Sequence, residues 1–202
     1  MVESQLRNRG IRDERVLSAM LQVPRHEFVP AEYQDKAYAD HPIPIAENQT
    51  ISQPFIIALS LEALALNGSE RVLEVGTGSG YQTALLAVLA REVFSIERRP
   101  VLAQSAEALL NRLGYANVTI VVGDGSNGVP QFAPFDAIVV SAAAPQVPRS
   151  LFDQLAENGR MVIPVGPPQA QELQLVRKQN GEIRVRVLEG CRFVPLIGAE
   201  GY

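Results

Sequence analysis

From about residue 68 onward, short apolar runs alternate with longer stretches of helical periodicity. This alternation predicts a mostly parallel sheet with crossover helices, a doubly wound α/β fold. The predicted strands are Arg71–Val75, Glu92–Ile96, Val118–Val122, Ala137–Ser141 and Arg160–Val165. The predicted helices are Tyr81–Ala90, Val101–Leu113 and Arg149–Glu157. Gly114 and Gly159 follow two of these helices and are expected to take left-handed, helix-ending conformations.

The end of the chain has a different pattern. Two apolar segments, Glu172–Gln179 and Glu182–Leu188, flank the dipeptide Asn180-Gly181. This dipeptide favours a two-residue turn between antiparallel strands. We therefore expect the sheet to close with an antiparallel C-terminal hairpin.

The residues before the sheet predict helices. Asp13 is a suitable N-cap for a helix that Pro24 ends. The apolar face of this helix is expected to carry Val16, Leu17, Met20 and Leu21. A second apolar helix is predicted from Pro54, a residue favoured in a first turn, to a stop at Asn67-Gly68.

A glycine-rich turn follows the first predicted strand, with glycines at positions 76, 78 and 80. A dinucleotide fingerprint would place its third glycine at position 81. Glu74, two positions before Gly76, suits an ammonium group, directly or through water, and free backbone N–H groups suit a carboxylate. Because S-adenosyl-L-methionine carries both groups and no phosphate, the turn favours it over NAD.

Two more polar features come at the ends of the next strands. Glu97 can accept hydrogen bonds from both ribose hydroxyls, and Asp124 can accept one from an adenine amino group, while Gly125 leaves room for the ring. Parallel strands bring such residues to one edge of a sheet. The predicted cofactor residues are therefore Glu74, Gly76, Thr77, Gly78, Gly80, Glu97, Asp124 and Gly125.

Composition narrows the class of protein. The 202 residues carry a formal charge of −4 and one cysteine, Cys191. The acidic balance argues against a nucleic-acid partner, and one cysteine excludes an internal disulfide and a paired-cysteine metal site. The start of the chain lacks an apolar signal core, and no run has membrane-spanning length. We expect a cytoplasmic, monomeric protein without a metal or a membrane partner.

The methyl acceptor is predicted from two segments. After the fourth strand, Ser141–Pro145 offers almost no hydrogen-bond acceptors, which disfavours an amino-group substrate but not a carboxylate. Gln49–Pro54 offers hydroxyls, amides and helix N–H groups that can donate to an anion. Ser52 has two interpretations, because its hydroxyl could also simply cap the helix that begins near Pro54, which the sequence alone favours.

The chain resembles the protein-L-isoaspartate O-methyltransferase family over nearly its whole length. The segments that carry the resemblance are Arg15–Met20, Val23–Arg25, Phe28–Pro30, Gln49–Pro54, Val72–Gln82, Gly123–Gly125, Phe135–Ile138, Gly159–Gly166 and Arg192–Leu196. The family usually has glycine before the Gln-Thr-Ile-Ser run, where this chain has Asn48. Asparagine is the next best residue for a positive φ, so we expect the loop to keep the same backbone conformation.

The resemblance implies a class I methyltransferase fold and methyl transfer to the free α-carboxylate of L-isoaspartyl residues in damaged proteins and peptides. It implies that Ser52 is the active-site residue. The implied substrate-binding residues are Thr50, Ile51, Ser52, Gln53 and Val194. We predict one domain, 1–202, in which 1–67 form a helical, substrate-facing segment and 68–202 form the cofactor-binding sheet core and hairpin. The alternatives are an O-methyltransferase for another small acceptor and a non-catalytic cofactor-binding protein.

Overall fold

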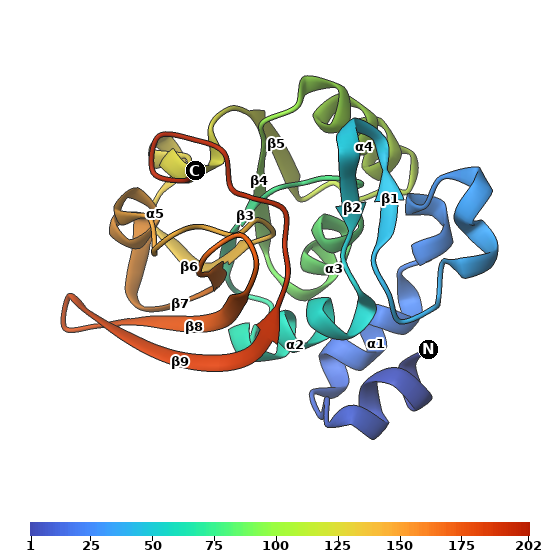
Figure 1. Cartoon of the computed structure of the whole chain (residues 1–202), viewed down its shortest axis with the longest axis horizontal. Helices are drawn as coiled ribbons and strands as arrows, with labels where there is room; N and C mark the ends of the chain where they lie inside the picture. The colour runs from blue at the N-terminus through green and yellow to red at the C-terminus, as the bar shows by residue number, and fades with distance from the viewer.

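The computed structural model describes residues 1–202 and contains one large sheet and one small one. The large sheet has seven strands in the order β5-β4-β3-β6-β7-β8-β9 (Figure 1). Their bounds are β3 Arg71–Val75, β4 Glu92–Glu97, β5 Val118–Val122, β6 Phe135–Val140, β7 Leu155–Val165, β8 Gln171–Gln179 and β9 Glu182–Cys191. Strands β3 to β7 pair in parallel, whereas β8 and β9 are antiparallel additions. The doubly wound sheet and its antiparallel ending are confirmed.

Five α-helices accompany the sheet: α1 Glu14–Gln22, α2 Pro54–Leu64, α3 Tyr81–Leu89, α4 Pro100–Arg112 and α5 Arg149–Gln154. Helix α3 connects β3 to β4, and α4 connects β4 to β5, so the chain moves toward one edge of the sheet. Helix α5 connects β6 to β7, toward the other edge. Because these crossovers run in opposite directions from β3, the sheet has a switch point there, where ligands bind in open α/β sheets.

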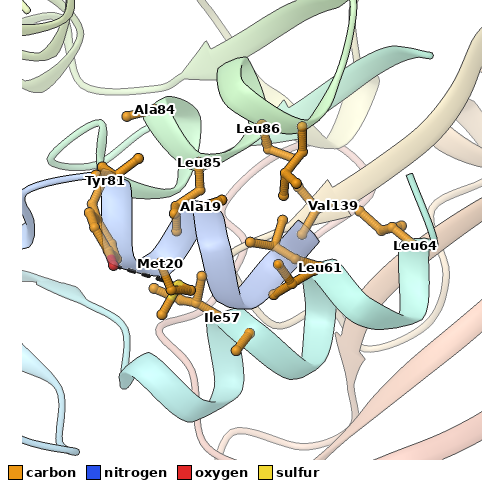
Figure 2. Close-up of a cluster of buried hydrophobic side chains, with 14 of the residues drawn as sticks. Ala19, Met20, Ile57, Leu61, Leu64, Tyr81, Ala84, Leu85, Leu86 and Val139 are labelled. Carbon is orange, nitrogen blue, oxygen red and sulfur yellow. Dashed lines mark hydrogen bonds between the residues drawn. The ribbon is translucent and has the colours of Figure 1, made fainter. Parts of the chain in front are cut away.

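Two apolar clusters form the core, and alternate residues of the strands divide between them. The larger cluster joins the first 67 residues to the sheet, through residues such as Met20 and Leu61 together with Val72 and Val139. In Figure 2, α1, α2 and α3 meet there, and the Tyr81 hydroxyl donates to the Met20 sulfur at 3.6 Å. The smaller cluster packs Leu73 and other inward residues of the opposite face against α5.

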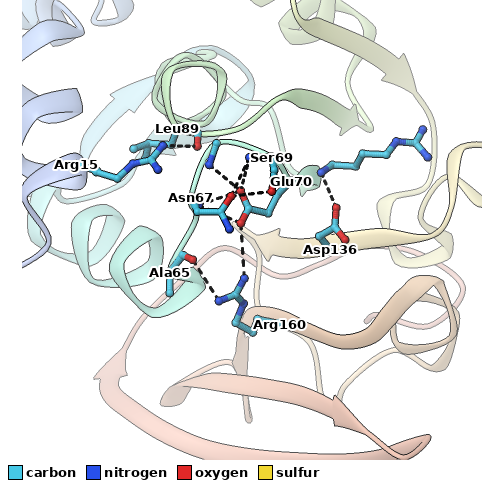
Figure 3. A network of polar contacts seen from close by, with 10 residues as sticks. Arg15, Ala65, Asn67, Ser69, Glu70, Leu89, Asp136 and Arg160 are labelled. Atoms are coloured by element: carbon cyan, nitrogen blue, oxygen red, sulfur yellow. Dashed lines mark hydrogen bonds and ion pairs between the residues drawn. The ribbon is translucent and has the colours of Figure 1, made fainter.

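A polar network holds the amino-terminal end of β3 (Figure 3). The Glu70 carboxylate is 4% exposed and accepts hydrogen bonds from the backbone N–H groups of Asn67, Gly68 and Ser69. The Asp136 carboxylate accepts another from the Arg71 N–H at 2.8 Å. These hydrogen bonds anchor the amino-terminal end of β3.

Two predicted turns have the expected backbone. Asn180 and Gly181 have φ values of 54° and 73°, which make the hairpin turn between β8 and β9. Asn48 has a φ of 56°, so asparagine does occupy the left-handed conformation expected before the Gln-Thr-Ile-Ser run. That run forms β2, Gln49–Ile51, which pairs antiparallel with β1, Ile43–Ile45.

Other local predictions were wrong. The left-handed residue near the end of α5 is Asn158, with a φ of 63°, because β7 begins early at Leu155 and Gly159 lies inside it. Helix α2 ends at Leu64 with Ala65 as its left-handed C-cap, before Asn67-Gly68. Leu21 is 71% exposed, so the apolar face of α1 does not extend to it.

Candidate active site

Three cavities meet at the carboxyl ends of β3, β4 and β6. The glycine-loop cleft, about 900 Å³ of space that includes open solvent, is lined by Asn48, Gln49, Thr50, Val75, Gly76, Gly78, Ile96, Glu97, Arg98, Arg99, Gly125, Ser141, Ala142 and Val194–Ile197. The hairpin cavity, about 790 Å³ of space that likewise includes open solvent, is lined by Pro42, Thr50, Ser52, Gln53, Ile56, Ser141 and Gly190–Val194. The inner cavity is lined by Thr50, Ile51, Ser52, Ile57, Gly76–Ser79, Tyr81, Gln82 and Ser141. Thr50 and Ser141 therefore form the junction of all three.

The glycine-rich turn takes a conformation that few other residues adopt. Gly76, Gly78 and Gly80 have φ values of 93°, 55° and 87°. Their N–H groups are already engaged, with Gly76 donating to Ile96 O at 2.8 Å and Gly80 to Thr77 O at 2.9 Å. The N–H groups without an acceptor belong to Thr77 and Ser79. The glycines thus shape the turn, and its free donors come from the residues between them.

Glu97 is the acidic side chain that lines the glycine-loop cleft, and it is 7% exposed. Its Oε2 accepts a hydrogen bond from Gly78 N at 2.9 Å, and its Oε1 accepts one from Arg99 N at 2.9 Å. Each carboxylate oxygen retains a further lone pair. Glu97 therefore presents a fixed acceptor pair to the cleft.

Glu74 lies behind the turn, and its side chain reaches none of the three cavities. It is fully buried, and its carboxylate accepts hydrogen bonds from Thr83 Oγ1, Ser95 Oγ and Gln82 Nε2 at 2.5, 2.6 and 3.1 Å. Burial raises the pKa of Glu74 to about 7, although these three hydrogen bonds oppose the shift. Glu74 therefore makes no direct contact with a ligand in these cavities, because Gln82 lies between Glu74 and the inner cavity.

Asp124 and Gly125 follow β5 at the rim of the glycine-loop cleft. Asp124 Oδ1 accepts from Ser126 N at 2.9 Å, and Oδ2 accepts from Ala199 N at 2.8 Å. Burial alone would raise the pKa of Asp124, but the hydrogen bonds from Ala199 and Ser126 outweigh it and lower the pKa. Gly125 lines the cleft, while Asp124 is tied to the C-terminal turn beside it.

Ser52 does not cap α2. The N-cap of this helix is Gln53, without a side-chain cap, and Asp40 Oδ1 accepts from Phe55 N at 3.2 Å instead. The Ser52 hydroxyl makes no hydrogen bond to another residue, and Ser52 lines both the hairpin cavity and the inner cavity. The favoured interpretation of Ser52 as a helix cap is therefore wrong, and its hydroxyl is free for a ligand.

The other predicted substrate residues take different places. Thr50 is exposed and lines every cavity, whereas Ile51 is 4% exposed and pairs with Ile43 in the small sheet. Gln53 donates through Nε2 to Asp40 Oδ2 at 2.7 Å. The Val194 carbonyl accepts from Ala143 N at 2.8 Å, while its own N–H has no acceptor in the chain. Val194 can thus offer a backbone donor to the hairpin cavity.

The hairpin cavity has a consistent chemical character. No aspartate or glutamate lines it, and its polar groups include Arg192 and the hydroxyls of Thr50, Ser52 and Ser141. Cys191 also lines it, where burial raises the pKa of the thiol to about 11, so the sulfur stays protonated at neutral pH. Such a cavity suits an anion that needs donors and does not need a base.

Two residues of this region were not predicted from the sequence. Ser141 lies in the acceptor-poor segment Ser141–Pro145, for which the sequence predicts no contact with a ligand. Arg25 lies in Val23–Arg25, a segment that contributes to the family resemblance but to no predicted site. Arg25 is fully buried and donates through Nη2 to Ser52 O at 2.9 Å. No local sequence pattern marks either residue, because the position of each in the site depends on contacts with residues far apart in the chain.

The structure has neither a metal-binding cluster nor a membrane-spanning helix. No group of histidine, cysteine, aspartate and glutamate side chains is arranged to hold a metal ion. None of the helices combines the length and the apolar character that crossing a bilayer requires.

Comparison with known proteins gives a consistent result over the whole chain. Residues 1–201 match the family model of protein-L-isoaspartate(D-aspartate) O-methyltransferase. A protein-L-isoaspartate O-methyltransferase of Koribacter versatilis is 58% identical over 202 residues, which cover 100% of this chain and 91% of the relative. A second, from Syntrophobacter fumaroxidans, is 54% identical over 202 residues, 100% of this chain and 94% of the relative.

Solved structures agree. One protein-L-isoaspartate O-methyltransferase structure superposes with a TM-score of 0.89 at 32% identity, covering 100% of this chain and 67% of the other. A Plasmodium falciparum protein described as a protein-L-isoaspartate O-methyltransferase, crystallised with S-adenosyl-L-homocysteine, gives a TM-score of 0.84 at 32% identity. That match covers 97% of this chain and 96% of the other.

Proposed function

Because the chain belongs to the protein-L-isoaspartate(D-aspartate) O-methyltransferase family, we propose that it methylates the free α-carboxylate of L-isoaspartyl residues in damaged proteins and peptides. S-adenosyl-L-methionine is the methyl donor. The observation that carries the substrate assignment is the hairpin cavity, which has donors and no acidic side chain and shares Thr50 and Ser141 with the glycine-loop cleft. A carboxylate in the one cavity thereby faces a cofactor in the other.

The glycine-loop cleft fits this cofactor. The Glu97 carboxylate would accept from the ribose hydroxyls, and Gly125, with no Cβ, would border the adenine. The free N–H groups of Thr77 and Ser79 in the inner cavity would serve the cofactor carboxylate. Gln82, held by Glu74, would face the ammonium group, so that Glu74 acts through it. Asp124 would support the adenine side of the cleft.

The chain's residues promote the reaction by placement. When bound, S-adenosyl-L-methionine supplies an electrophilic methyl group on a sulfonium. The substrate carboxylate is ionised at pH 7 and needs no general base, which agrees with a cavity lined by no histidine or carboxylate. Ser52, Thr50 and the Val194 N–H would orient it with neutral hydrogen bonds. Well-aligned proximity of this kind can supply about 7–11 kcal/mol of the barrier.

Neutral donors suit this reaction better than fixed charges. An anion and a sulfonium become two neutral products, so charge is dispersed in the transition state. A fixed positive charge on the carboxylate would stabilise the ground state more than the transition state. The neutral hydroxyls at the cavity junction therefore hold the carboxylate nucleophile without stabilising its ground state as strongly as a fixed charge would.

Assembly and location are part of the proposal. We propose a single methyltransferase domain that acts as a cytoplasmic monomer without nucleic acid. The formal charge of −4 supports the absence of a nucleic-acid partner, and the lone cysteine, which excludes an internal disulfide, agrees with a cytoplasmic location. The apolar cluster shared by residues 1–67 and the sheet also supports one domain.

Transfer of radiolabelled methyl groups to paired synthetic peptides tests the function. One peptide contains L-isoaspartate and the other contains normal aspartate at the same position. We expect label on the isoaspartyl peptide alone, released by mild alkali as expected for a methyl ester. Equal labelling of both peptides would reject the repair function and favour a methyltransferase of other specificity. No labelling of either would reject the function altogether.

A further inference from the structure

A single chain of hydrogen bonds connects the buried carboxylate of Glu74 to the junction of the three cavities. Gln82 Nε2 donates to Glu74 Oε1 at 3.1 Å and to Ser141 Oγ at 2.9 Å. An amide nitrogen has two hydrogens, and this one uses both. The reverse orientation of the amide would set its oxygen against the ionised Glu74 carboxylate, so the chain has one favourable direction whenever Glu74 is ionised.

This direction determines what the Ser141 hydroxyl can do. Its oxygen accepts the hydrogen bond from Gln82, and it has no acceptor of its own within the chain. Its proton is therefore free to be donated. Because Ser141 lines all three cavities, that donation is directed to a ligand at their junction.

The backbone holds Ser141 in a fixed place. It directly follows β6, and its N–H donates to the Val75 carbonyl at 2.8 Å, which continues the pairing of β6 with β3. Its Cβ also lies against the glycine-rich turn, 3.4 Å from where a Cβ on Gly76 would be. A donor on a rigid element is placed more accurately than one on a mobile loop.

We propose that Ser141 donates a hydrogen bond to the isoaspartyl α-carboxylate and, together with Ser52, positions it for methyl transfer. This inference rests on the proposed function. The carboxylate is favoured over the cofactor as the acceptor because the hairpin cavity, which Ser52 and Ser141 both line, has hydroxyl donors and lacks acidic side chains. The cofactor carboxylate has its own donors in the N–H groups of Thr77 and Ser79.

The Glu74–Gln82 pair is then a positioning device for Ser141. With the amide held by the carboxylate, the Ser141 oxygen remains an acceptor and its proton remains available. Glu74 thereby influences the substrate without touching it, from a fully buried position 67 residues away in the chain.

The test compares Ser141→Thr with Ser141→Val. These two side chains have the same shape and differ in the hydroxyl, so any strain from the added methyl group is common to both. We expect Ser141→Val to lower kcat/KM for an L-isoaspartyl peptide by about tenfold to a hundredfold relative to Ser141→Thr, as expected for a lost hydrogen bond to a charged group. The dissociation constant of S-adenosyl-L-homocysteine, measured by calorimetry, should differ between them by less than about twofold.

A neutral inhibitor distinguishes a positioning role from a merely structural one. In an isoasparaginyl peptide the α-carboxylate is replaced by an amide, which forms weaker hydrogen bonds than an anion does. Its inhibition constant should change much less than kcat/KM between the two variants. Ser105→Ala, at an exposed serine of α4 whose hydroxyl bonds only to Val101 O, controls for general effects of serine replacement.

Two results would overturn the proposal. Equal kcat/KM for the Thr and Val variants would show that the hydroxyl has no role. A loss of S-adenosyl-L-homocysteine affinity in the Val variant, with kcat/KM lowered only in proportion, would assign the hydroxyl to the cofactor. If the unmodified protein fails to methylate the isoaspartyl peptide, the proposed function fails, which is a different outcome from equality of the two variants.

Discussion

The guanidinium of Arg25 donates through Nη2 to the carbonyl oxygen of Ser52 at 2.9 Å, and Arg25 is fully buried. Its Nε donates to Ala37 O at 2.7 Å, and the group lies over the Tyr81 ring, 4.7 Å from the centroid. No carboxylate forms an ion pair with it, and burial lowers its pKa. A desolvated charge therefore holds the segment that carries Ser52 against the two 3-10 helices before it, Arg25–Phe28 and Ala31–Lys36.

Replacement of Arg25 should damage both stability and activity. A lysine cannot make both hydrogen bonds of the planar guanidinium, so Arg25→Lys leaves at least one buried carbonyl without a donor. We expect the free energy of unfolding, measured by urea denaturation, to fall by about 1–3 kcal/mol. At temperatures where the variant is folded, kcat/KM for the isoaspartyl peptide should also fall, because the Ser52 segment loses its anchor. Arg91→Lys, at an exposed arginine without an ion pair, should change neither quantity.

Ser52→Ala, unlike Arg25→Lys, should lower activity and leave stability unchanged. The hydroxyl caps no helix, so its loss should leave the melting temperature within about 1 °C, whereas loss of an N-cap costs about 1 kcal/mol, or about 2–4 °C for a chain of this size. A hydrogen bond to the substrate carboxylate is worth about 1–3 kcal/mol, so kcat/KM should fall by about fivefold to 150-fold. A lower melting temperature with full activity would return Ser52 to a structural role.

The features that could be predicted from the sequence are local ones. Apolar runs and glycines locate each strand of the sheet core, because a buried strand and a tight turn each impose their own residue types. The positive φ at Asn48 and Asn180 could be predicted for the same reason, since few residues other than glycine tolerate that conformation.

What could not be predicted depends on contacts between distant residues. Whether Ser52 caps α2 is decided by Asp40, which takes that place. Glu74 has no access to the cavities because β4 and α3 cover it with Ser95 and Thr83. The role of Ser141 depends on the orientation of Gln82, 59 residues earlier in the chain. A serine after a strand has no sequence pattern that signals such a role.

The pKa of Glu74 makes stability depend on pH. The folded-state pKa of about 7 lies above the unfolded value of 4.5, so the folded protein binds an extra proton between these pH values. Stability from this group is therefore fully present below pH 4.5 and is lost as the pH rises to about 7. The loss is on the order of a few kcal/mol, because a tenfold change in a proton-binding constant corresponds to about 1.4 kcal/mol.

Glu74→Gln, which cannot ionise, isolates this effect. The difference in unfolding free energy between the unmodified protein and the variant should shift in favour of the variant from about pH 5 to about pH 8. Urea denaturation at several pH values in one buffer series measures it. Parallel pH profiles for the two proteins would show that Glu74 does not titrate in this range.

Gly125 should not tolerate alanine, for a reason that lies in the sheet core. A Cβ there would come within 2.5 Å of Val75 Cγ1, on the buried carboxyl end of β3, so the turn after β5 would have to move. Overpacking of this kind costs about 1–3 kcal/mol, and the displaced turn borders the glycine-loop cleft. We expect Gly125→Ala to lower the unfolding free energy by that amount and to weaken S-adenosyl-L-homocysteine binding in calorimetry. Gly123→Ala is the matched control, because its Cβ would meet only the flexible end of Ile96, at 3.3 Å. If the two variants lose stability and affinity equally, close packing against Val75 is not the reason for glycine at position 125.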